Sequence, residues 1–347
     1  MKNKFKPFII ALLFIFTITF GASAQLYVPT QQQQQQQQYN PYQQQQYNPY
    51  QQQYNPYQQQ QQYNPYQQQP PMGADAQLVM QDQMMVQQMC SRYPADYRYN
   101  QLLNNISSRF NQAGPRVFSN WNTKDVQYIV LAGPLGFNAV AFHQSIVIDS
   151  LLMDSLRKLA EGIAFYGKFD TPYTHSLAKV TLQRMQEMQS GRTQMNFNNL
   201  ENPFNLPSAG NLTPQQQQMA ARMFEEMVAG FLSHEGSHGF LEHTKEKMMT
   251  QQALWIKNQG KVEPQRLTQE ITNYISKDFS KNKEFEADAY AARLLKASGY
   301  DKRGIIYWFQ LGTLLEQYSG ASQNPAERTH PTGKQRTDNV NKVWNTL

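Results

Sequence analysis

The chain has 347 residues, of which 40% are hydrophobic and 16% are charged, and this length can bury a sizeable core without disulfide bonds. Its formal net charge is +6, and no basic run is interleaved with aromatic side chains, which argues against a protein that binds nucleic acid. The single cysteine, Cys90, excludes an intramolecular disulfide bond.

Residues 1–24 have the pattern of a secretory signal peptide. Three lysines precede a short apolar run, Phe8–Phe20, and an A-x-A site follows at Ala22–Ala24. Cleavage after Ala24 removes those three lysines from the 31 basic residues and leaves 28 against 25 acidic residues, a balance of +3. We therefore predict an exported chain, periplasmic or secreted, with no transmembrane segment after cleavage. A retained membrane anchor is the alternative, although a bilayer span needs about 20 apolar residues.

Residues 25–75 form a low-complexity segment that is rich in glutamine, tyrosine and proline. A glutamine run at Gln31–Gln38 is followed by four Tyr-Asn-Pro-Tyr repeats between Tyr39 and Tyr66. The near absence of aliphatic side chains predicts disorder, because such a segment cannot bury a core. We interpret the segment as a passive spacer, or alternatively as an adhesive tether to the envelope, to a partner or to itself.

The folded region is predicted to cover residues 76–347, and its first part combines helices with strands. The hydrophobic pattern predicts helices at Gln77–Ser91 and Tyr99–Phe110. It predicts strands at Asp125–Ala132 and Ala139–Asp149, with the glycine- and proline-containing stretch between them as a turn.

Helices are predicted to dominate the second part of the folded region. Thr213-Pro214 is typical of a helix start, with threonine as the N-cap residue and proline at the first helical position. An apolar stripe that includes Met219, Met223 and Met227 follows and indicates a helix face buried in the core. Further helices are predicted at Pro264–Ala297, from Asp301 to about Tyr318, and after Pro331.

The stretch His234-Glu235-Gly236-Ser237-His238 follows this stripe and fits the pattern HExxH. Four residues advance a helix by about 400°, so the two imidazoles leave the same face and can bind one metal ion. Glu235 lies about 100° around the helix, where its carboxylate can act on a water that the metal activates. Short patterns also arise by chance, but this one lies in a predicted helix. The motif therefore predicts a zinc hydrolase.

A catalytic zinc site needs a third protein ligand, usually His, Asp or Glu. If the helix continued, His243 would lie about 180° around it from His234, so it is expected to point away. The remaining histidines outside the motif have no local partner and stay open as candidates: His143, His175 and His330.

A stronger candidate is the acidic pair in Glu284-Phe285-Glu286-Ala287-Asp288. Glu284 and Asp288 are one helical turn apart and share a face. One carboxylate can bind the metal, and the other can hydrogen-bond the remote nitrogen of a histidine ligand. Acidic pairs at this spacing are also common on solvated helix faces, so the pair gains its weight from following HExxH.

In the order of these elements the chain resembles metallopeptidase family 48, the gluzincins that include HtpX and the CAAX prenyl proteases. That family shows HExxH, then E-x-x-A-D on a later helix, then Thr/Ser-His-Pro before an arginine. The matching stretches here are HEGSH, Glu284–Asp288, and Thr329–Pro331 with Arg336. Upstream, Asn138–Phe142 followed by Ser145–Asp149 is similar to the family's N-A-F-A strand.

The resemblance implies an α+β, mostly helical fold: a zincin-like metallopeptidase domain with a small β-sheet and an HExxH active-site helix. It implies one Zn²⁺ per chain, bound by His234, His238 and Glu284, with Glu235 as the general base. The lack of further membrane helices favours a soluble, secreted type of the family.

The resemblance also implies supporting residues around the metal. It places Asp288 in a hydrogen bond to a histidine ligand, and it places His330 and Arg336 near the site, with His330 as a further catalytic group. It suggests an edge strand on which a substrate peptide adds by backbone pairing. The residues of that strand are Ser145, Ile146, Val147, Ile148 and Asp149.

One departure from the family pattern is the long interval before the motif. Residues 155–212 look expanded or inserted, and Gly191–Leu212 is rich in Asn, Pro and Gly. We hypothesise that this loop is a lid over the cleft, a partner surface or a passive elaboration.

We interpret the chain as a secreted zinc-dependent endopeptidase whose substrates are unfolded or misfolded polypeptides, with a role in envelope protein quality control. The first alternative is a weakly catalytic or non-catalytic envelope chaperone or scaffold on a metallopeptidase fold. The second is a hydrolase that uses the same metal geometry on a bond other than a peptide.

Overall fold

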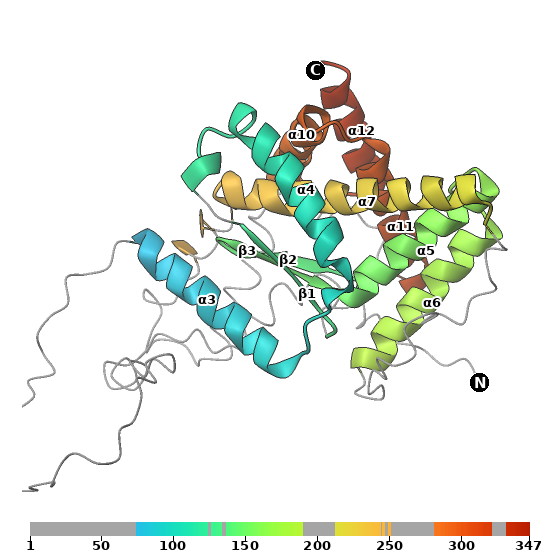
Figure 1. Ribbon diagram of the computed structural model, residues 1–347, viewed down its shortest axis with the longest axis horizontal. Helices are drawn as coiled ribbons and strands as arrows, with labels where there is room; N and C mark the ends of the chain where they lie inside the picture. The colour runs from blue at the N-terminus through green and yellow to red at the C-terminus, as the bar shows by residue number, and fades with distance from the viewer. Residues whose placement is uncertain are drawn as a thin grey trace, which may run out of the picture.

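A three-stranded β-sheet lies between one helix on one face and several helices on the other in the computed structural model (Figure 1). The structure describes residues 74–123, 126–133, 137–189, 212–243, 245–246, 249–250, 281–320 and 331–347. The predicted signal peptide and almost all of the predicted low-complexity segment lie outside these residues. Within the described part of the chain, no helix has the length and apolar character that a membrane span requires. The predicted α+β, mostly helical fold is confirmed.

The sheet has the strand order β1–β3–β2. Strand β1 (Gln127–Leu131) pairs in parallel with β3 (Ser145–Asp149), and β2 (Ala139–Ala141) pairs antiparallel with β3. The prediction of one continuous strand from residue 139 to residue 149 was wrong. The Phe142 N–H donates to the Ser145 carbonyl over 2.7 Å and closes a tight turn, so this stretch forms a hairpin. The turn that we predicted after β1 connects β1 to β2 along the chain, but these two strands are not paired in the sheet.

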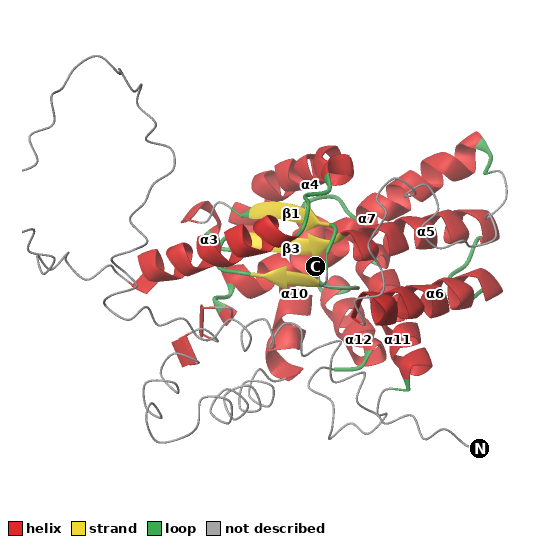
Figure 2. Cartoon of the chain, turned by 90° about the horizontal axis from the view of Figure 1, so that it is seen from below, coloured by secondary structure: helices red, strands yellow, loops and turns green. Residues whose placement is uncertain are grey.

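The two faces of the sheet belong to two hydrophobic clusters. Ile146 and Ile148 point into the main core, whereas Leu131 and Val147 pack on the opposite face with Met89 of helix α3. This alternation is what a strand requires when both of its faces are covered. Accordingly, α3 and α7 lie on opposite sides of the sheet, and α5 and α6 lie beside it (Figures 1 and 2).

The two helices predicted in the first part agree with α3 (Ala74–Arg92) and α4 (Asn100–Ala113) to within a few residues. The structure adds helical elements that were not predicted individually: η1 (Tyr97–Tyr99), η2 (Gly114–Arg116), η3 (Trp121–Thr123), α5 (Ser150–Tyr166) and α6 (Pro172–Gln189). Helices α5 and α6 include the beginning of the stretch that we interpreted as expanded. The hypothesised lid lies outside the described residues, except for Leu212.

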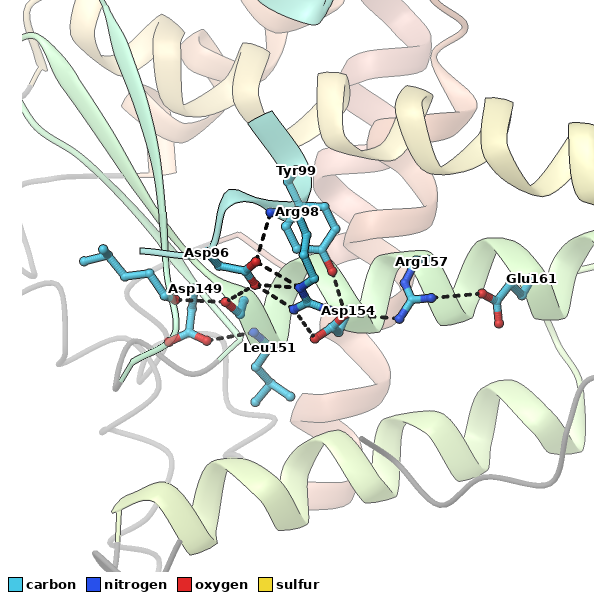
Figure 3. Close-up of polar contacts among 10 residues, drawn as sticks. Asp96, Arg98, Tyr99, Asp149, Leu151, Asp154, Arg157 and Glu161 are labelled. Carbon is cyan, nitrogen blue, oxygen red and sulfur yellow. Dashed lines mark hydrogen bonds and ion pairs between the residues drawn. The ribbon is translucent and has the colours of Figure 1, made fainter. Parts of the chain in front are cut away.

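A polar network joins the start of α5 to the sheet (Figure 3). The Asp149 carboxylate at the end of β3 accepts the Leu151 N–H over 2.8 Å and caps the helix. Arg98 bridges two buried carboxylates, with Nη2 at 2.6 Å from Asp96 Oδ2 and 3.2 Å from Asp154 Oδ2. Buried carboxylates are stable when they are paired in this way. The network therefore fixes α5, on which α7 packs.

Helix α7 (Pro214–Phe240) is the long helix that contains HEGSH. Its predicted start is confirmed: Thr213 Oγ1 accepts the Gln216 N–H, and the Gln216 side chain accepts the Thr213 N–H, which is a capping box. The half of the helix from residue 226 onward is almost completely buried. Its neighbours are α5, α10 and α11.

Three helices complete the core: α10 (Lys281–Ala297), α11 (Arg303–Ser319) and α12 (Gly333–Trp344). The part of the predicted helix before residue 281 lies outside the described residues. The Asp301 carboxylate accepts the Arg303 N–H over 2.8 Å at the start of α11. Thr332 and Gln335 form a second capping box at the start of α12. These helices bring residues far apart in sequence next to the buried half of α7.

Candidate metal centre

His234 and His238 lie one turn apart on the buried face of α7. Their relative exposures are 3% and 9%, and their Nε2 atoms lie 3.2 Å apart. The helical spacing therefore brings the two imidazoles to the same face of α7, as the sequence predicted, and both rings turn their Nε2 atoms toward one point.

Glu284, from the first turn of α10, supplies a third donor at that point. Its Oε2 lies 3.5 Å from His234 Nε2, and its Oε1 lies 3.6 Å from His238 Nε2. Its relative exposure is 6%. Within the described residues, these three side chains form the one group of three or more His, Cys, Asp or Glu residues that could hold a metal ion.

The spacing of these donors fits zinc. Ligand atoms bound about 2.0–2.2 Å from a tetrahedral zinc lie about 3.3–3.6 Å from one another. The observed separations lie close to that range: 3.2 Å between the two Nε2 atoms, 3.5 Å from His234 Nε2 to Glu284 Oε2 and 3.6 Å from His238 Nε2 to Glu284 Oε1. Two imidazoles and one carboxylate are a common catalytic zinc set, which keeps a fourth position open. The residues present are therefore suited to a catalytic zinc ion.

Asp288 accepts a hydrogen bond from the other ring nitrogen of His234, and Arg336 in turn donates to Asp288. Asp288 Oδ1 lies 2.9 Å from His234 Nδ1, and Asp288 is fully buried. Arg336, from α12, donates to Asp288 Oδ1 over 2.7 Å, and the same Nη2 atom lies 2.9 Å from His234 Nδ1 and 3.0 Å from His234 Nε2. A carboxylate at this nitrogen fixes the tautomer and the orientation of a histidine ligand. Asp288 and Arg336 thus both lie beside His234.

The pKa values of the two histidines shift in opposite directions. Burial and the Arg336 charge lower the pKa of His234, but hydrogen bonds to Asp288 and Glu284 outweigh them and raise it to about 9. Burial lowers the pKa of His238 well below its ordinary value. Burial also lowers the pKa of Arg336, but Asp288 and Glu284 outweigh it and raise the pKa above the ordinary value. Arg336 is therefore a permanent cation beside the three donors.

His243 does not point away from the site, so that prediction was wrong. Helix α7 ends at Phe240, and Glu242 has a φ of 61°, in the left-handed region. The chain therefore turns back, and His243 Nδ1 lies 3.0 Å from His238 Nδ1. The prediction assumed a continuous helix, and a glutamate gives no sequence signal for a left-handed turn.

The other predicted site residues have different outcomes. Glu235 is half-buried next to His234, and its charge contributes to the raised pKa of Arg336. His330 lies outside the described residues. His143 is buried near Asp82, and His175 contacts Asp170 and Tyr318, so neither joins the three donors.

Ser145–Asp149 is the central strand of the described sheet, so its predicted place at the edge was wrong. Both of its edges are paired, one with β1 and the other with β2, which leaves no backbone edge for a substrate. In the described sheet, β2 is the edge strand next to α7. Phe142 directly follows β2, and its carbonyl lies close to Gly239 of α7. A strand order of this kind is a non-local property that the local pattern does not contain.

Sequence reasoning also missed the aromatic side chains at the site. The Trp308 ring centroid lies 5.5 Å from that of His234. The Arg336 guanidinium carbon lies 4.1 Å from the Phe309 ring centroid and 5.3 Å from that of Trp308. Both aromatics fit the apolar pattern of α11, and only the packing of α11 on α7 gives them this contact.

Comparison with known proteins finds a match to one described family. Residues 216–343 match the family model described as Peptidase family M48, and this segment includes all three donors, Asp288 and Arg336. The searches of curated proteins and of solved structures returned no match.

Proposed function

Residues 216–343 are a metallopeptidase segment of peptidase family M48, and on that premise we propose that the chain is a zinc-dependent endopeptidase. The observation that supports the metal most directly is the convergence of His234 Nε2, His238 Nε2 and the Glu284 carboxylate, at separations close to those of a tetrahedral site. The buried Asp288–Arg336 pair supports the same assignment, because it orients one of the ligands.

The proposed mechanism gives each side chain one task. His234, His238 and Glu284 hold the ion, which when bound supplies Lewis acidity and lowers the pKa of a water to about 7. Glu235 takes the proton from the attacking water and delivers it to the leaving amine. Asp288 keeps the His234 ring in place. His330, which directly precedes the described residue Pro331, remains proposed as a group that stabilises the oxyanion.

The proposed substrates are unfolded or misfolded polypeptides. An extended peptide can add to an open sheet edge, where backbone hydrogen bonds bind it with little dependence on side chains. Strand β2 (Ala139–Ala141) is the edge strand of the described sheet on this side and contacts α7. We therefore assign substrate pairing to β2 in place of Ser145–Asp149.

Export and tethering complete the proposal. The pattern of residues 1–24 supports export to the periplasm or beyond, and the Gln/Tyr-rich residues 25–75 support a spacer or tether at the envelope. A role in envelope protein quality control agrees with unfolded substrates in that compartment.

The decisive experiment is the substitution Glu235→Gln. The amide cannot accept the water proton, so the variant should bind one zinc per chain like the wild type but lose casein cleavage by at least about 100-fold. Zinc content and casein cleavage are measured on the same preparations. Full cleavage by this variant would show that the assigned mechanism is wrong.

The scaffold alternative is tested by Glu284→Ala. Removal of one of three ligands should abolish stoichiometric zinc in an enzyme. A wild-type protein that contains no zinc and cleaves no casein would instead support a scaffold.

A further inference from the structure

We propose that His243 is a positioning residue for the zinc ligand His238, and that Glu286 continues the chain of hydrogen bonds to the protein surface. This inference rests on the proposed function, because it concerns the same metal centre. It assigns a task to two residues that the HExxH motif does not include.

The position of His243 is the first observation. The residue lies just beyond the end of α7, is 3% exposed and has its Nδ1 3.0 Å from His238 Nδ1. It reaches this position through Glu242, whose φ of 61° is the one positive value among the described residues other than glycine. Such a conformation costs about 1 kcal/mol and persists where the surrounding structure requires it. The turn therefore serves to bring His243 back to His238.

The direction of the hydrogen bonds follows from the chemistry of imidazole. A neutral imidazole carries its proton on one nitrogen and accepts with the other. His238 turns Nε2 toward the other two donors, so Nε2 must be the unprotonated ligand atom and Nδ1 must carry the proton. His243 Nδ1 then accepts this proton's hydrogen bond, and the His243 proton lies on Nε2.

Glu286 satisfies the second nitrogen of His243. Its Oε2 lies 3.2 Å from His243 Nε2, so the carboxylate accepts the remaining N–H. The Glu286 side chain is 51% exposed, whereas that of His243 is 4% exposed. The chain thus runs from the buried metal centre through His238 and His243 to a solvated carboxylate, and each bond has one donor and one acceptor.

The two histidine ligands are therefore supported in different ways. Asp288 contacts the outer nitrogen of His234 directly, whereas a neutral imidazole stands between His238 and its carboxylate. An imidazole acceptor fixes the ring of His238 and its tautomer without placing a second negative charge in the buried site. Loss of such an outer partner typically weakens metal binding by about 10–100-fold.

The test compares His243→Leu with His243→Asn in the full chain. Leucine fills the space but accepts no hydrogen bond, so zinc affinity should fall by about 10–100-fold. The Oδ1 of asparagine is attached as Nδ1 is in histidine, two bonds from Cβ, so His243→Asn should keep the acceptor and retain most of the affinity. Zinc dissociation constants are measured by competition with a chelator, with circular dichroism to verify folding.

The matched control is His175→Asn on α6. His175 also has a carboxylate on Nε2, Asp170 at 2.8 Å, and a second partner on Nδ1, Tyr318 at 2.6 Å, but it lies outside the donor set. Its substitution should leave zinc affinity unchanged. A folded His243→Leu protein with wild-type affinity would overturn the inference, and so would a His243→Asn protein as weak as His243→Leu.

The outcomes separate this inference from the proposed function. Wild-type protein that binds zinc but does not cleave casein overturns the endopeptidase assignment, and the zinc affinities of the His243 variants still decide the inference. Wild-type protein that binds no zinc overturns both. Normal cleavage with unchanged affinity in His243→Leu overturns the inference alone.

Discussion

The charge of His234 is set by burial and by three neighbours from two other helices. Asp288 and Glu284 of α10 favour the protonated ring, whereas burial and Arg336 of α12 disfavour it, and the pKa rises to about 9. A metal ligand must give up that proton, so zinc competes with a proton at this nitrogen. His238, with its lowered pKa, adds no such competition at neutral pH.

Zinc affinity should consequently depend on pH. At a pH below the His234 pKa of about 9, the metal-free ring is protonated, and one proton is released for each zinc bound. The apparent affinity should therefore rise about tenfold for each pH unit across the neutral range and level off above pH 9. Competition with a chelator at two pH values, corrected for protonation of the chelator, measures this slope. A flat profile between pH 6.5 and 7.5 would contradict the protonated state of His234.

Helix packing explains why α7 and α11 lie so close together. A side chain at Gly304 of α11 would overlap the backbone of Glu226 in α7, whereas a side chain at Gly312 of the same helix would meet no atom within 4 Å. Gly304 thus permits the close approach that sets Trp308 and Phe309 beside the metal centre.

The two glycines predict opposite effects of the same substitution. Gly304→Ala should destabilise the protein by about 1–3 kcal/mol, because the backbones must move apart. Gly312→Ala should stabilise it by about 0.5–1 kcal/mol, because alanine is the better helix former in open space. Urea unfolding of both variants measures the two changes. Equal effects of the two substitutions would show that the close crossing does not determine the stability.

Elements whose signals are local could be predicted from the sequence, and those that depend on distant partners could not. Thr213-Pro214 defines a helix start within four residues, and His234 and His238 share a face because of helical geometry alone. The place of β3 between β1 and β2 depends on how three separated strands pair. The return of His243 depends on one left-handed residue, Glu242, whose side chain does not favour that conformation.

The metal centre connects parts of the molecule that are distant in sequence. His234 and His238 come from α7, Glu284 and Asp288 from α10, and Arg336 from α12. A metal ion bound there would hold α7 and α10 together, and α12 would join them through the Arg336–Asp288 pair.

Zinc should therefore stabilise the whole fold. At a free zinc concentration about 100 times the dissociation constant, binding to the folded state alone adds about 2.7 kcal/mol to the free energy of unfolding. Urea unfolding with zinc and with a chelator measures the difference, and Glu284→Ala should abolish it. The same shift in the Glu284→Ala protein would place the stabilising metal at another site.

Arg336 is synthesised after all of the other residues of the candidate metal centre that the structure describes. It follows His234 by 102 residues and lies on the last described helix, α12. A nascent or truncated polypeptide that ends before α12 carries the three donors but leaves Asp288 without its guanidinium partner, so the His234 ring is held less firmly. Translation of α12 thus completes the hydrogen-bonded support of the His234 ring.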